Sequence, residues 1–429
     1  MTRQLSIFLL AVMLLSACGS KDENAVANML AGCDVVASRK VVGGDTVIVW
    51  HSERMDPDRK IRIPLSAFID SLEIVTLDGS DEAAFCGMGP IWISDNYILT
   101  SEGMRNAPSL LFRRDGSFVS MLGSYGEGPG EYRWLIVSRQ IDEKNGRVYV
   151  HPQLNTNIMI YDLEGNYLGD IPLALTKAQL QMEFFVDQDG GSVDVIRLCN
   201  NYKNQLSTDT TVTIWQQTSE GRLTDSKLYP PFITTHRDML SDMLSMETMF
   251  KDKNGITFLA HHRYPEVEGR TDTLYRYDYQ AQKLIRLLTM EPPRPTTQQL
   301  VLPFSSYYLC RYWNEEDIPA ENSCRSHYGI LDPATLRGAE CEIYNDLLGG
   351  IDLSMFDWQG SIFDQIYDIN FGFAWMYDPG DLLDKVETRL EKPDISEADR
   401  KILESLRERI NPEGNNIILL GRPKDRVGS

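Results

Sequence analysis

The amino-acid sequence predicts an all-β fold and, within that class, a β-propeller. Short segments of alternating apolar and polar residues, typical of half-buried strands, follow one another from about Thr46 onward. Turns built on Asp, Asn or Gly separate these segments. Equivalent turn glycines recur at long and similar intervals, at Gly116, Gly165 and Gly221. The repeating unit, of about 50 residues, is the size of a four-stranded propeller blade.

The first expected strands are residues 47–50, 96–100, 109–113, 147–150 and 157–161. A series of β-sandwiches is the alternative, but its turns would recur every 8–12 residues or so. Dividing the β-rich part of the chain by the repeat length gives about six or seven blades. Because one blade cannot bury both of its faces, blades stacked into a ring would supply the core.

The C-terminal region departs from this pattern. Residues 379–392 and 396–410 each carry an apolar stripe at helical spacing, and the second begins with the capping-box sequence Ser396-Glu397-Ala398-Asp399. They predict a helical hairpin that packs one face on the propeller. Residues 417–420 predict a final strand, which we expect to pair into the blade made from the first strands and so close the ring.

Two segments carry a resemblance to a known family. They are Phe112-Arg113-Arg114-Asp115-Gly116-Ser117-Phe118 and Leu122-Gly123-Ser124-Tyr125-Gly126-Glu127-Gly128-Pro129-Gly130-Glu131-Tyr132. They resemble the Bacteroidetes six-bladed β-propeller lipoprotein family, which is similar to TolB-like and NHL-like propellers. The resemblance covers nearly the whole chain from Cys18 onward. It implies six blades and a place at the cell envelope, but little about activity, because that family's function is poorly defined.

The N-terminal segment, residues 1–23, predicts export. Arg3 precedes an apolar run over residues 5–15 that is too short to span a bilayer, as in a secretory signal peptide. Leu15-Ser16-Ala17-Cys18 resembles the lipobox of bacterial lipoproteins, which implies cleavage before Cys18 and lipidation of Cys18. An ordinary secretory peptide with an incidental cysteine is the alternative. Ser20-Lys21-Asp22-Glu23 resembles the signal that sends lipoproteins of Bacteroidetes to the cell surface.

These observations predict an outer-membrane lipoprotein, on the cell surface or the periplasmic face. The expected organisation is a signal peptide (1–17), a lipidated N-terminus and tether (18–45), a propeller (46–378), a helical hairpin (379–412), and a closing strand with a tail (413–429). The formal net charge of −20 would repel nucleic acid, so we expect no nucleic-acid partner. The expected partners are the membrane, through the lipid anchor, and an unidentified protein or glycan.

Six cysteines besides Cys18 could pair or stay free. They are Cys33, Cys86, Cys199, Cys310, Cys324 and Cys341. Six cysteines allow fifteen pairings, and the absence of C-x-x-C argues against a zinc ribbon or a thioredoxin-type site. Buried free thiols and disulfides both remain open, and Cys310 with Cys324 is the first pair to test.

The glycine-rich run at 126–130 invites comparison with a phosphate-binding loop. Position 131 is Glu rather than the Gly of a dinucleotide fingerprint, and no Gly-Lys-Ser/Thr follows. We therefore interpret the run as a rigid loop between blades in which Glu131 and Tyr132 act as structural pins. The residues of this structural loop are Gly126, Gly128, Pro129, Gly130, Glu131 and Tyr132.

No catalytic motif emerges from the histidines or the serines. His51, His151, His236, His261, His262 and His327 form no helix-spaced metal pair, and no Gly-x-Ser-x-Gly elbow is present. We expect no catalytic residue, no cofactor and no metal ligand. A metal ion in the central channel stays open, because a ring can bring distant residues together on its axis.

Aromatic residues cluster late in the chain and suggest a binding surface. Tyr307, Tyr308, Tyr312 and Trp313 lie near Pro303 and Asn314, so we expect a ligand-facing loop on the ring's face. A second group, Phe371, Phe373, Trp375 and Tyr377, alternates. It is better explained as one face of a strand packed between blades than as an exposed surface.

The leading functional hypothesis is a non-catalytic recognition module that binds a protein or a glycan at the cell envelope. It depends on the predicted anchor, the missing catalytic motifs and the loops that a propeller presents; fold alone does not establish function. The alternative is a metal-dependent, lactonase- or lyase-like enzyme with its site in the central channel.

Overall fold

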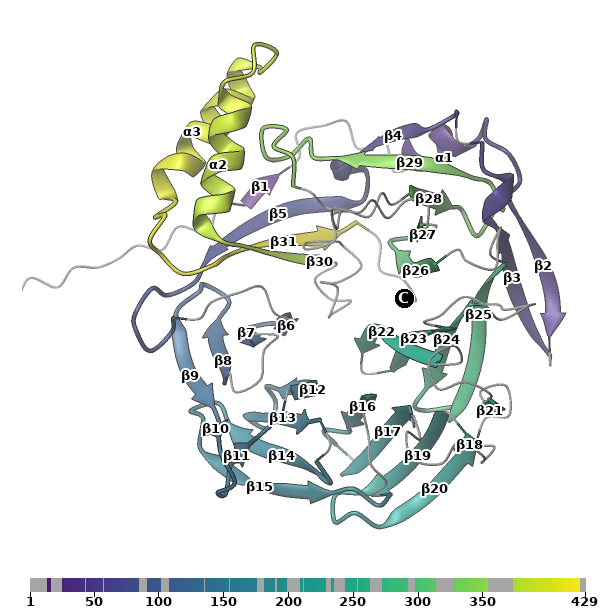
Figure 1. Ribbon diagram of the computed structural model, residues 1–429, viewed down its shortest axis with the longest axis vertical. Coiled ribbons are helices and arrows are strands. Elements are labelled where there is room, and N and C mark those ends of the chain that lie inside the picture. Colours follow the sequence, from purple (N-terminus) through teal and green to yellow (C-terminus); the bar gives the residue numbers. More distant parts are fainter. Residues whose placement is uncertain are drawn as a thin grey trace, which may run out of the picture.

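The computed structural model describes most of the chain. The described residues are 14–16, 25–42, 44–56, 58–84, 91–101, 108–134, 136–153, 155–175, 181–189, 191–198, 209–210, 212–228, 233–234, 244–252, 254–262, 272–291, 298–313, 327–353 and 373–424. They form six β-sheet blades arranged in a ring (Figure 1). The predicted six-bladed β-propeller is confirmed.

Three blades are each built from four antiparallel strands of one continuous stretch of chain. Blade 1 contains β6 (Ile91–Ile93), β7 (Tyr97–Ser101), β8 (Ser109–Arg113) and β9 (Phe118–Leu122). Blade 2 contains β12 (Ile136–Asp142), β13 (Arg147–Pro152), β14 (Asn157–Asp162) and β15 (Tyr167–Pro172). Blade 3 contains β16 (Gln181–Val186), β17 (Ser192–Leu198), β19 (Val212–Thr218) and β20 (Leu223–Leu228).

The other three blades combine later strands with strands from the N-terminal region. Blade 4 contains β22 (Leu244–Asp252), β23 (Gly255–His262), β24 (Asp272–Asp278) and β25 (Lys283–Glu291), followed at its outer edge by β3 (Asp45–His51) and β2 (Ala37–Val42). Blade 5 contains β26 (Gln298–Phe304), β27 (Tyr307–Trp313), β28 (His327–Leu331) and β29 (Gly338–Tyr344), followed by β4 (Ile61–Pro64). Blade 6 contains β30 (Phe373–Tyr377), β31 (Ile417–Pro423), β5 (Ile69–Thr76) and β1 (Leu14–Ser16).

The ring closes through blade 6, where the two ends of the chain meet. The last strand, β31, pairs antiparallel with β5, and Ile417 lies opposite Thr76 in the register. Its other edge pairs with β30, where Tyr377 lies opposite Ile417. The predicted closing strand is therefore confirmed. This closure gives both edges of the last strand a partner.

The N-terminal region forms a belt around the outside of blades 4, 5 and 6 before blade 1 begins. Strand β3 pairs parallel with β25, and β4 pairs parallel with β29. Helix α1 (Ala25–Leu30) buries Val26 and Leu30 in the largest apolar cluster. The tether expected over 18–45 is therefore replaced, over 25–42, by packed helix and strand. The segment is ordered, despite its polar sequence, because Val26 and Leu30 are buried and because β2 and β3 form hydrogen bonds at the edge of the blade 4 sheet.

Apolar clusters lie at the boundaries between neighbouring blades, and the largest extends over blades 4 to 6 and the C-terminal helices. Glycine turns allow the blades to approach closely. Gly221, in the turn between β19 and β20, has a φ of +77°. A Cβ at this position would lie 2.6 Å from the carbonyl oxygen of Pro172 in blade 2. Only glycine avoids both the unfavourable backbone geometry and the collision.

The predicted helical hairpin is present as α2 (Pro379–Leu390) and α3 (Glu397–Arg409), inserted between β30 and β31. The Asp378 side chain caps α2 by accepting hydrogen bonds from the backbone of Gly380 and Asp381. The expected Ser396 cap begins α3, where its hydroxyl accepts from the Asp399 backbone at 3.0 Å. Both helices bury apolar side chains in the largest apolar cluster. They lie at one side of the ring, next to blade 6 (Figure 1). In the described part of the chain, no helix has the length and apolarity needed to cross a bilayer.

Short elements complete the structure. They are η1 (Ser52–Arg54), η2 (Leu65–Ala67), and the paired strands β10 (Ser124–Tyr125) with β11 (Glu131–Tyr132) and β18 (Asp209–Thr210) with β21 (Ile233–Thr234).

Candidate functional site at the mouth of the central channel

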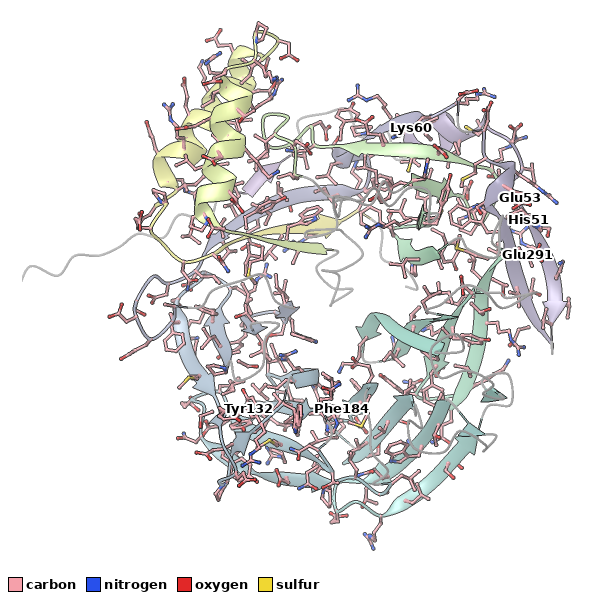
Figure 2. The ribbon with its side chains drawn as sticks, in the orientation of Figure 1. His51, Glu53, Lys60, Tyr132, Phe184 and Glu291 are labelled. Carbon is pink, nitrogen blue, oxygen red and sulfur yellow. The ribbon has the colours of Figure 1, made fainter. Side chains whose placement is uncertain are left out.

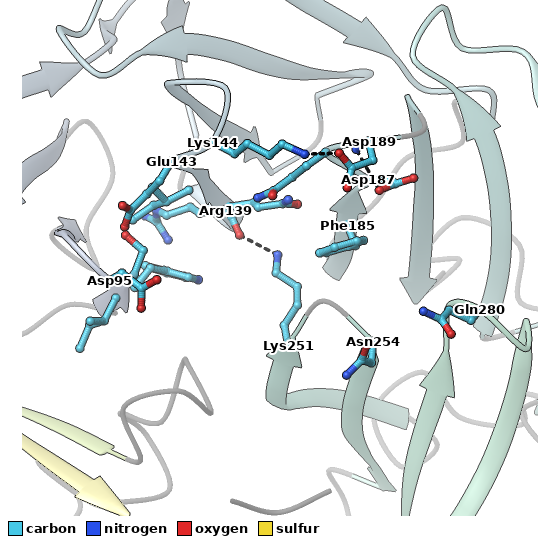
Figure 3. A pocket seen from close by; sticks show the side chains of 16 residues that line it. Asp95, Arg139, Glu143, Lys144, Phe185, Asp187, Asp189, Lys251, Asn254 and Gln280 are labelled. Atoms are coloured by element: carbon cyan, nitrogen blue, oxygen red, sulfur yellow. Dashed lines mark hydrogen bonds and ion pairs between the residues drawn. The ribbon is translucent and has the colours of Figure 1, made fainter. Parts of the chain in front are cut away.

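A polar pocket of about 610 Å³ lies where the first strands and their following turns in four blades converge (Figure 3). Residues 92–95 come from blade 1, residues 139–144 (except 142) from blade 2 and residues 185–189 (except 186) from blade 3. Lys251, Asn254 and Gln280 come from blade 4. We call this the channel pocket. Most of these residues lie at the end of a first strand or in the turn that follows it, whereas Gln280 lies in the turn between β24 and β25. Side chains as distant in the sequence as Trp92 and Gln280 thus line the pocket together.

Lys251 forms one side of the channel pocket and joins three blades. Its Nζ donates to the carbonyl oxygens of Arg139, at 2.6 Å, and of Phe184, at 2.9 Å. It also lies 3.4 Å from Ser138 Oγ and 3.3 Å from Glu183 Oε2, and 4.7 Å above the Phe184 ring. The Lys251 side chain is 11% exposed. The ammonium group is thus enclosed by oxygens from blades 2 and 3, while its backbone belongs to blade 4.

Two neighbouring side chains on β12 are also fixed by contacts between blades. The buried Arg139 guanidinium lies 3.8 Å from the centre of the Trp92 ring in blade 1. The Gln140 amide pairs with the backbone of Val186 in blade 3, accepting from its N–H and donating to its carbonyl oxygen, both at 2.8 Å. These contacts hold the wall of the pocket in one geometry.

The charged groups at the pocket's mouth are held by their neighbours as well. Glu143 accepts hydrogen bonds from the backbone and the side-chain amide of Asn96 in blade 1. Burial alone would raise the pKa of Glu143, but hydrogen bonds from Ser94 and Asn96 outweigh it and lower the pKa. Lys144 forms an ion pair with Asp189 of blade 3, and this hydrogen bond raises the pKa of Lys144.

The pocket therefore offers a fixed set of hydrogen-bonding groups beside aromatic surface. Phe185 lines it and stacks on Tyr279 with ring centres 4.6 Å apart. Asp95, Gln188 and Gln280 contribute exposed polar side chains from blades 1, 3 and 4. Among the residues that the structure describes, no three His, Cys, Asp or Glu side chains are grouped closely enough to hold a metal ion.

The aromatic residues expected on a ligand-facing loop belong instead to β27, the second strand of blade 5. Tyr307, Tyr308 and Tyr312 are half-buried against the largest apolar cluster, and burial raises the pKa of Tyr308 to about 12. The Tyr312 hydroxyl donates to Glu340, and its ring stacks on His327. The loop prediction is wrong because this tyrosine-rich segment pairs on both edges as a strand. The side chain of Trp313 lies outside the described residues.

The second aromatic group is strand-like, as the favoured interpretation had it. Trp375 and Tyr377 belong to β30 and are 1% and 8% exposed. The Tyr377 hydroxyl donates to the carbonyl oxygen of Leu353. Residue 371 and the side chain of Phe373 lie outside the described part of the chain.

The glycine-rich run forms a compact loop between blades 1 and 2. The Glu131 carboxylate accepts from the Gly128 backbone at 2.8 Å. The buried Tyr132 hydroxyl donates to the carbonyl oxygen of Leu122 and accepts from the backbone of Ser109 (Figure 2). Gly130 has a φ of +76°, and its carbonyl accepts from the Tyr161 hydroxyl at 2.9 Å. In this loop, Gly126 and Pro129 lie between the two short strands β10 and β11.

Three cysteines, Cys33, Cys310 and Cys341, are buried free thiols. Burial raises the pKa of Cys310 and raises that of Cys341 to about 12, so both thiols stay protonated near neutral pH. Cys310 is thus not paired with Cys324. Cys18, Cys86, Cys199 and Cys324 fall outside the described residues.

Histidines occupy separate parts of the ring. His51 lies on the outer edge of blade 4, with its Nδ1 3.0 Å from Glu291 and 3.8 Å from Glu53 (Figure 2). His151 is fully buried, and burial lowers its pKa to about 4. The side chains of His261 and His262, and the whole of His236, are not described.

Sequence reasoning did not find the channel pocket. Segments 142–146, 187–191 and 251–255 are rich in the Asp, Asn and Gly residues of turns, and each lies at the end of the first strand of its blade. Their equivalent places in successive blades were the available signal that they meet at one end of the ring. No feature of the sequence indicated that the side chains of Arg139 and Lys251 point toward the axis of the ring.

Comparisons with known proteins reveal the fold and the family. A crystal structure of a Bacteroides fragilis protein described as exported superposes with a TM-score of 0.53 at 16% identity, covering 85% of this chain and 99% of that one. A member of the DUF4221 family from Bacteroides vulgatus gives a TM-score of 0.47 at 7% identity, covering 82% and 97%. No curated protein matches. The model of a family described as "Domain of unknown function (DUF4934)" matches residues 48–422, and the chain belongs to this family.

Proposed function

We propose that the protein is an exported propeller, anchored by a lipid on Cys18, that acts as a non-catalytic recognition module for a protein or glycan at the cell envelope. The channel pocket is its binding site. The outer membrane, on the surface or the periplasmic face, is its proposed location. The signal-like N-terminus supports export, and the description of the structurally similar Bacteroides fragilis protein agrees with it.

One observation carries the proposal: the three basic side chains of the channel pocket are already engaged within the protein. Lys251 is enclosed by oxygens, Arg139 lies on Trp92, and Lys144 is paired with Asp189. Such contacts preorganise a site and reduce the ordering cost of binding. The remaining exposed groups are suited to hydrogen bonds with a polar ligand.

The electrostatics favour recognition over acid–base chemistry. A general acid or base works best with a pKa near the operating pH. In the channel pocket the pKa of Glu143 is lowered and that of Lys144 is raised, so both move away from neutrality. These two groups are therefore poorly suited to exchange protons with a substrate near neutral pH.

A binding experiment with matched variants tests the proposal. The pocket variant is Asp95→Ala/Gln188→Ala/Gln280→Ala, which removes exposed side chains from three blades. The probes are an array of envelope polysaccharide fragments and an array of peptides from envelope proteins. We expect the wild-type chain to bind a subset of one array and the pocket variant to lose that binding at least tenfold, as the loss of about 1.4 kcal/mol would produce.

The control variant, Glu164→Ala/Glu220→Ala/Arg222→Ala, removes as many exposed side chains from outer turns of blades 2 and 3. It should bind like the wild type. If the pocket variant still binds, the binding site does not lie in the channel pocket. Turnover of a lactone or an acidic polysaccharide by the wild-type chain would show that the protein is an enzyme and would reject the non-catalytic proposal.

A further inference from the structure

The point at which the N-terminal region joins the ring is firmly fixed. Helix α1 buries Val26 and Leu30, which are 3% and 1% exposed, in the largest apolar cluster. The chain after α1 is then attached to the turn between β28 and β29 of blade 5. The Gly338 backbone donates to the carbonyl oxygen of Asp34 at 3.1 Å, and the Val36 backbone donates to that of Leu336 at 3.0 Å.

The chain between this point and the proposed anchor is short. Cys18 precedes Ala25 by seven residues. Seven residues span at most about 25 Å when fully extended. A compact chain of this length has a radius of gyration of about 22 Å, and hence a diameter near 55 Å. A lipid on Cys18 therefore keeps the outer flank of blade 5 close to the membrane and leaves the opposite side of the ring out of reach.

The same N-terminal stretch exposes several apolar side chains. Met29 is 38% exposed, Val35 50%, Val41 75% and Val42 40%. They make up four of the nine large apolar side chains that are exposed in the described part of the chain, and all four lie in the short segment from Met29 to Val42. Helix α1 and strand β2, which carry three of them, lie on one outer flank of the ring, and β15 lies across the ring from them (Figure 1).

We infer that the outer flank of blades 4 and 5, formed by α1, residue 35 and β2, is the surface that rests on the lipid headgroups. This inference depends on the proposed acylation of Cys18. Exposed apolar side chains beside a lipid anchor gain free energy by entering the interface, and they add to the binding that acyl chains supply. The ring then stands on its outer flank, and the mouth of the channel pocket is not covered by the bilayer.

Fluorescence quenching in vesicles measures this orientation. The chain is acylated in cells and reconstituted into phosphatidylcholine/phosphatidylethanolamine vesicles that contain a spin-labelled phosphatidylcholine. One variant, Val41→Cys, places a fluorophore on β2; the matched variant, Leu168→Cys, places it on the exposed face of β15, across the ring. Both carry Cys86→Ser, Cys199→Ser and Cys324→Ser, while the three buried thiols do not react.

We expect the label at residue 41 to be quenched several-fold more strongly than the label at residue 168. Equal quenching, or stronger quenching at residue 168, in chains that float with the vesicles would overturn the orientation and leave the anchor intact. A Cys18→Ala chain should not float. Failure of the wild-type chain to float would reject the anchor itself, and the orientation with it.

Discussion

The Nζ atom of Lys251 lies 2.6 Å from the carbonyl oxygen of Arg139, although the two residues belong to blades 4 and 2. Blade 3 lies between these two blades. It contributes the Glu183 carboxylate and the carbonyl oxygen of Phe184 to the same ammonium group. Neighbouring blades already pack through apolar clusters. This lysine adds a polar connection near the axis, where the strands of different blades converge.

Replacing Lys251 with methionine should destabilise the protein strongly. Methionine keeps most of the apolar stem but leaves the Glu183 carboxylate, which is 14% exposed, without its cation. Removing one partner of a largely buried ion pair costs about 3 kcal/mol. Urea unfolding of the wild-type and variant chains should show this loss in the free energy of unfolding.

Lys144→Met is the matched control, because Lys144 lines the same pocket but its ion pair with Asp189 is exposed. Its loss should leave the free energy of unfolding nearly unchanged, because exposed ion pairs contribute little to stability. Equal effects of the two substitutions would mean that the enclosure of Lys251 contributes nothing. Adding Glu183→Gln to Lys251→Met should recover part of the loss, since the unpaired buried charge is then removed.

Gly165→Ala should weaken the boundary between blades 1 and 2. Gly165 has a φ of +87°, and a Cβ there would lie 2.6 Å from the carbonyl oxygen of Met121. Left-handed backbone alone costs alanine about 1–2 kcal/mol, and the collision adds to this. Gly146→Ala separates the two effects, because Gly146 has a φ of +62° and an added Cβ would meet nothing within 4 Å. In thermal unfolding, the melting temperature of Gly165→Ala should be well below that of Gly146→Ala. Similar melting temperatures would contradict the close approach of Gly165 to the backbone of Met121.

The same glycines explain why much of the fold was predictable. The intervals between Gly116, Gly165 and Gly221 reflect one structural requirement, a left-handed turn pressed against the preceding blade, repeated around the ring. Local turn chemistry thus carried information about blade packing. The helix cap at Ser396 was readable for the same reason, because its partner, the backbone of Asp399, lies three residues away. The cap at Asp378 was not predicted.

The channel pocket could not be predicted in this way. Lys251 and Arg139 are 112 residues apart, and nothing near either residue indicates that their side chains point toward the axis. The prediction that the β27 tyrosines lie on a ligand-facing loop was wrong for a related reason. An exposed loop and a half-buried strand can share the same aromatic-rich composition, and only the pairing with β26 and β28 separates them. The belt over residues 25–76 depends on parallel pairing with β25 and β29, which belong to the later half of the chain.

Stability should depend on pH through Asp194, a buried carboxyl in blade 3. Burial is the main cause that raises the pKa of Asp194 to about 6, and the nearby charge of Asp187 adds to it. The folded state therefore binds this proton more tightly than the unfolded state, whose pKa is near 3.8. The resulting stabilisation is complete below pH 3.8 and is lost as the pH rises through about 6.

Asp194→Asn should consequently stabilise the protein at pH 7.5 by up to about 2–3 kcal/mol. The asparagine oxygen can still accept the hydrogen bond from Gln216, which lies 3.3 Å from the carboxylate. The gain should disappear when the free energies of unfolding are compared at pH 4. Asp225→Asn, at an exposed carboxylate beside Lys227, is the control and should show no such difference. An Asp194→Asn chain less stable than the wild type at pH 7.5 would contradict the assignment of a destabilising buried charge.

Cleavage before Cys18 would remove β1, which pairs with β5 through three residues at the outer edge of blade 6. A chain that begins at residue 18, with Cys18→Ser, should therefore keep its free energy of unfolding within about 1 kcal/mol of the full-length chain, because a short edge strand adds little.

A chain that begins at residue 44 should behave differently, since it also loses β2 and the buried side chains of Val26 and Leu30. Each of these side chains stabilises the core by about 2 kcal/mol, so this chain should unfold at a much lower urea concentration. If removal of residues 1–17 alone has an equally large effect, β1 is an integral strand of blade 6, and cleavage at this position would be incompatible with the folded ring.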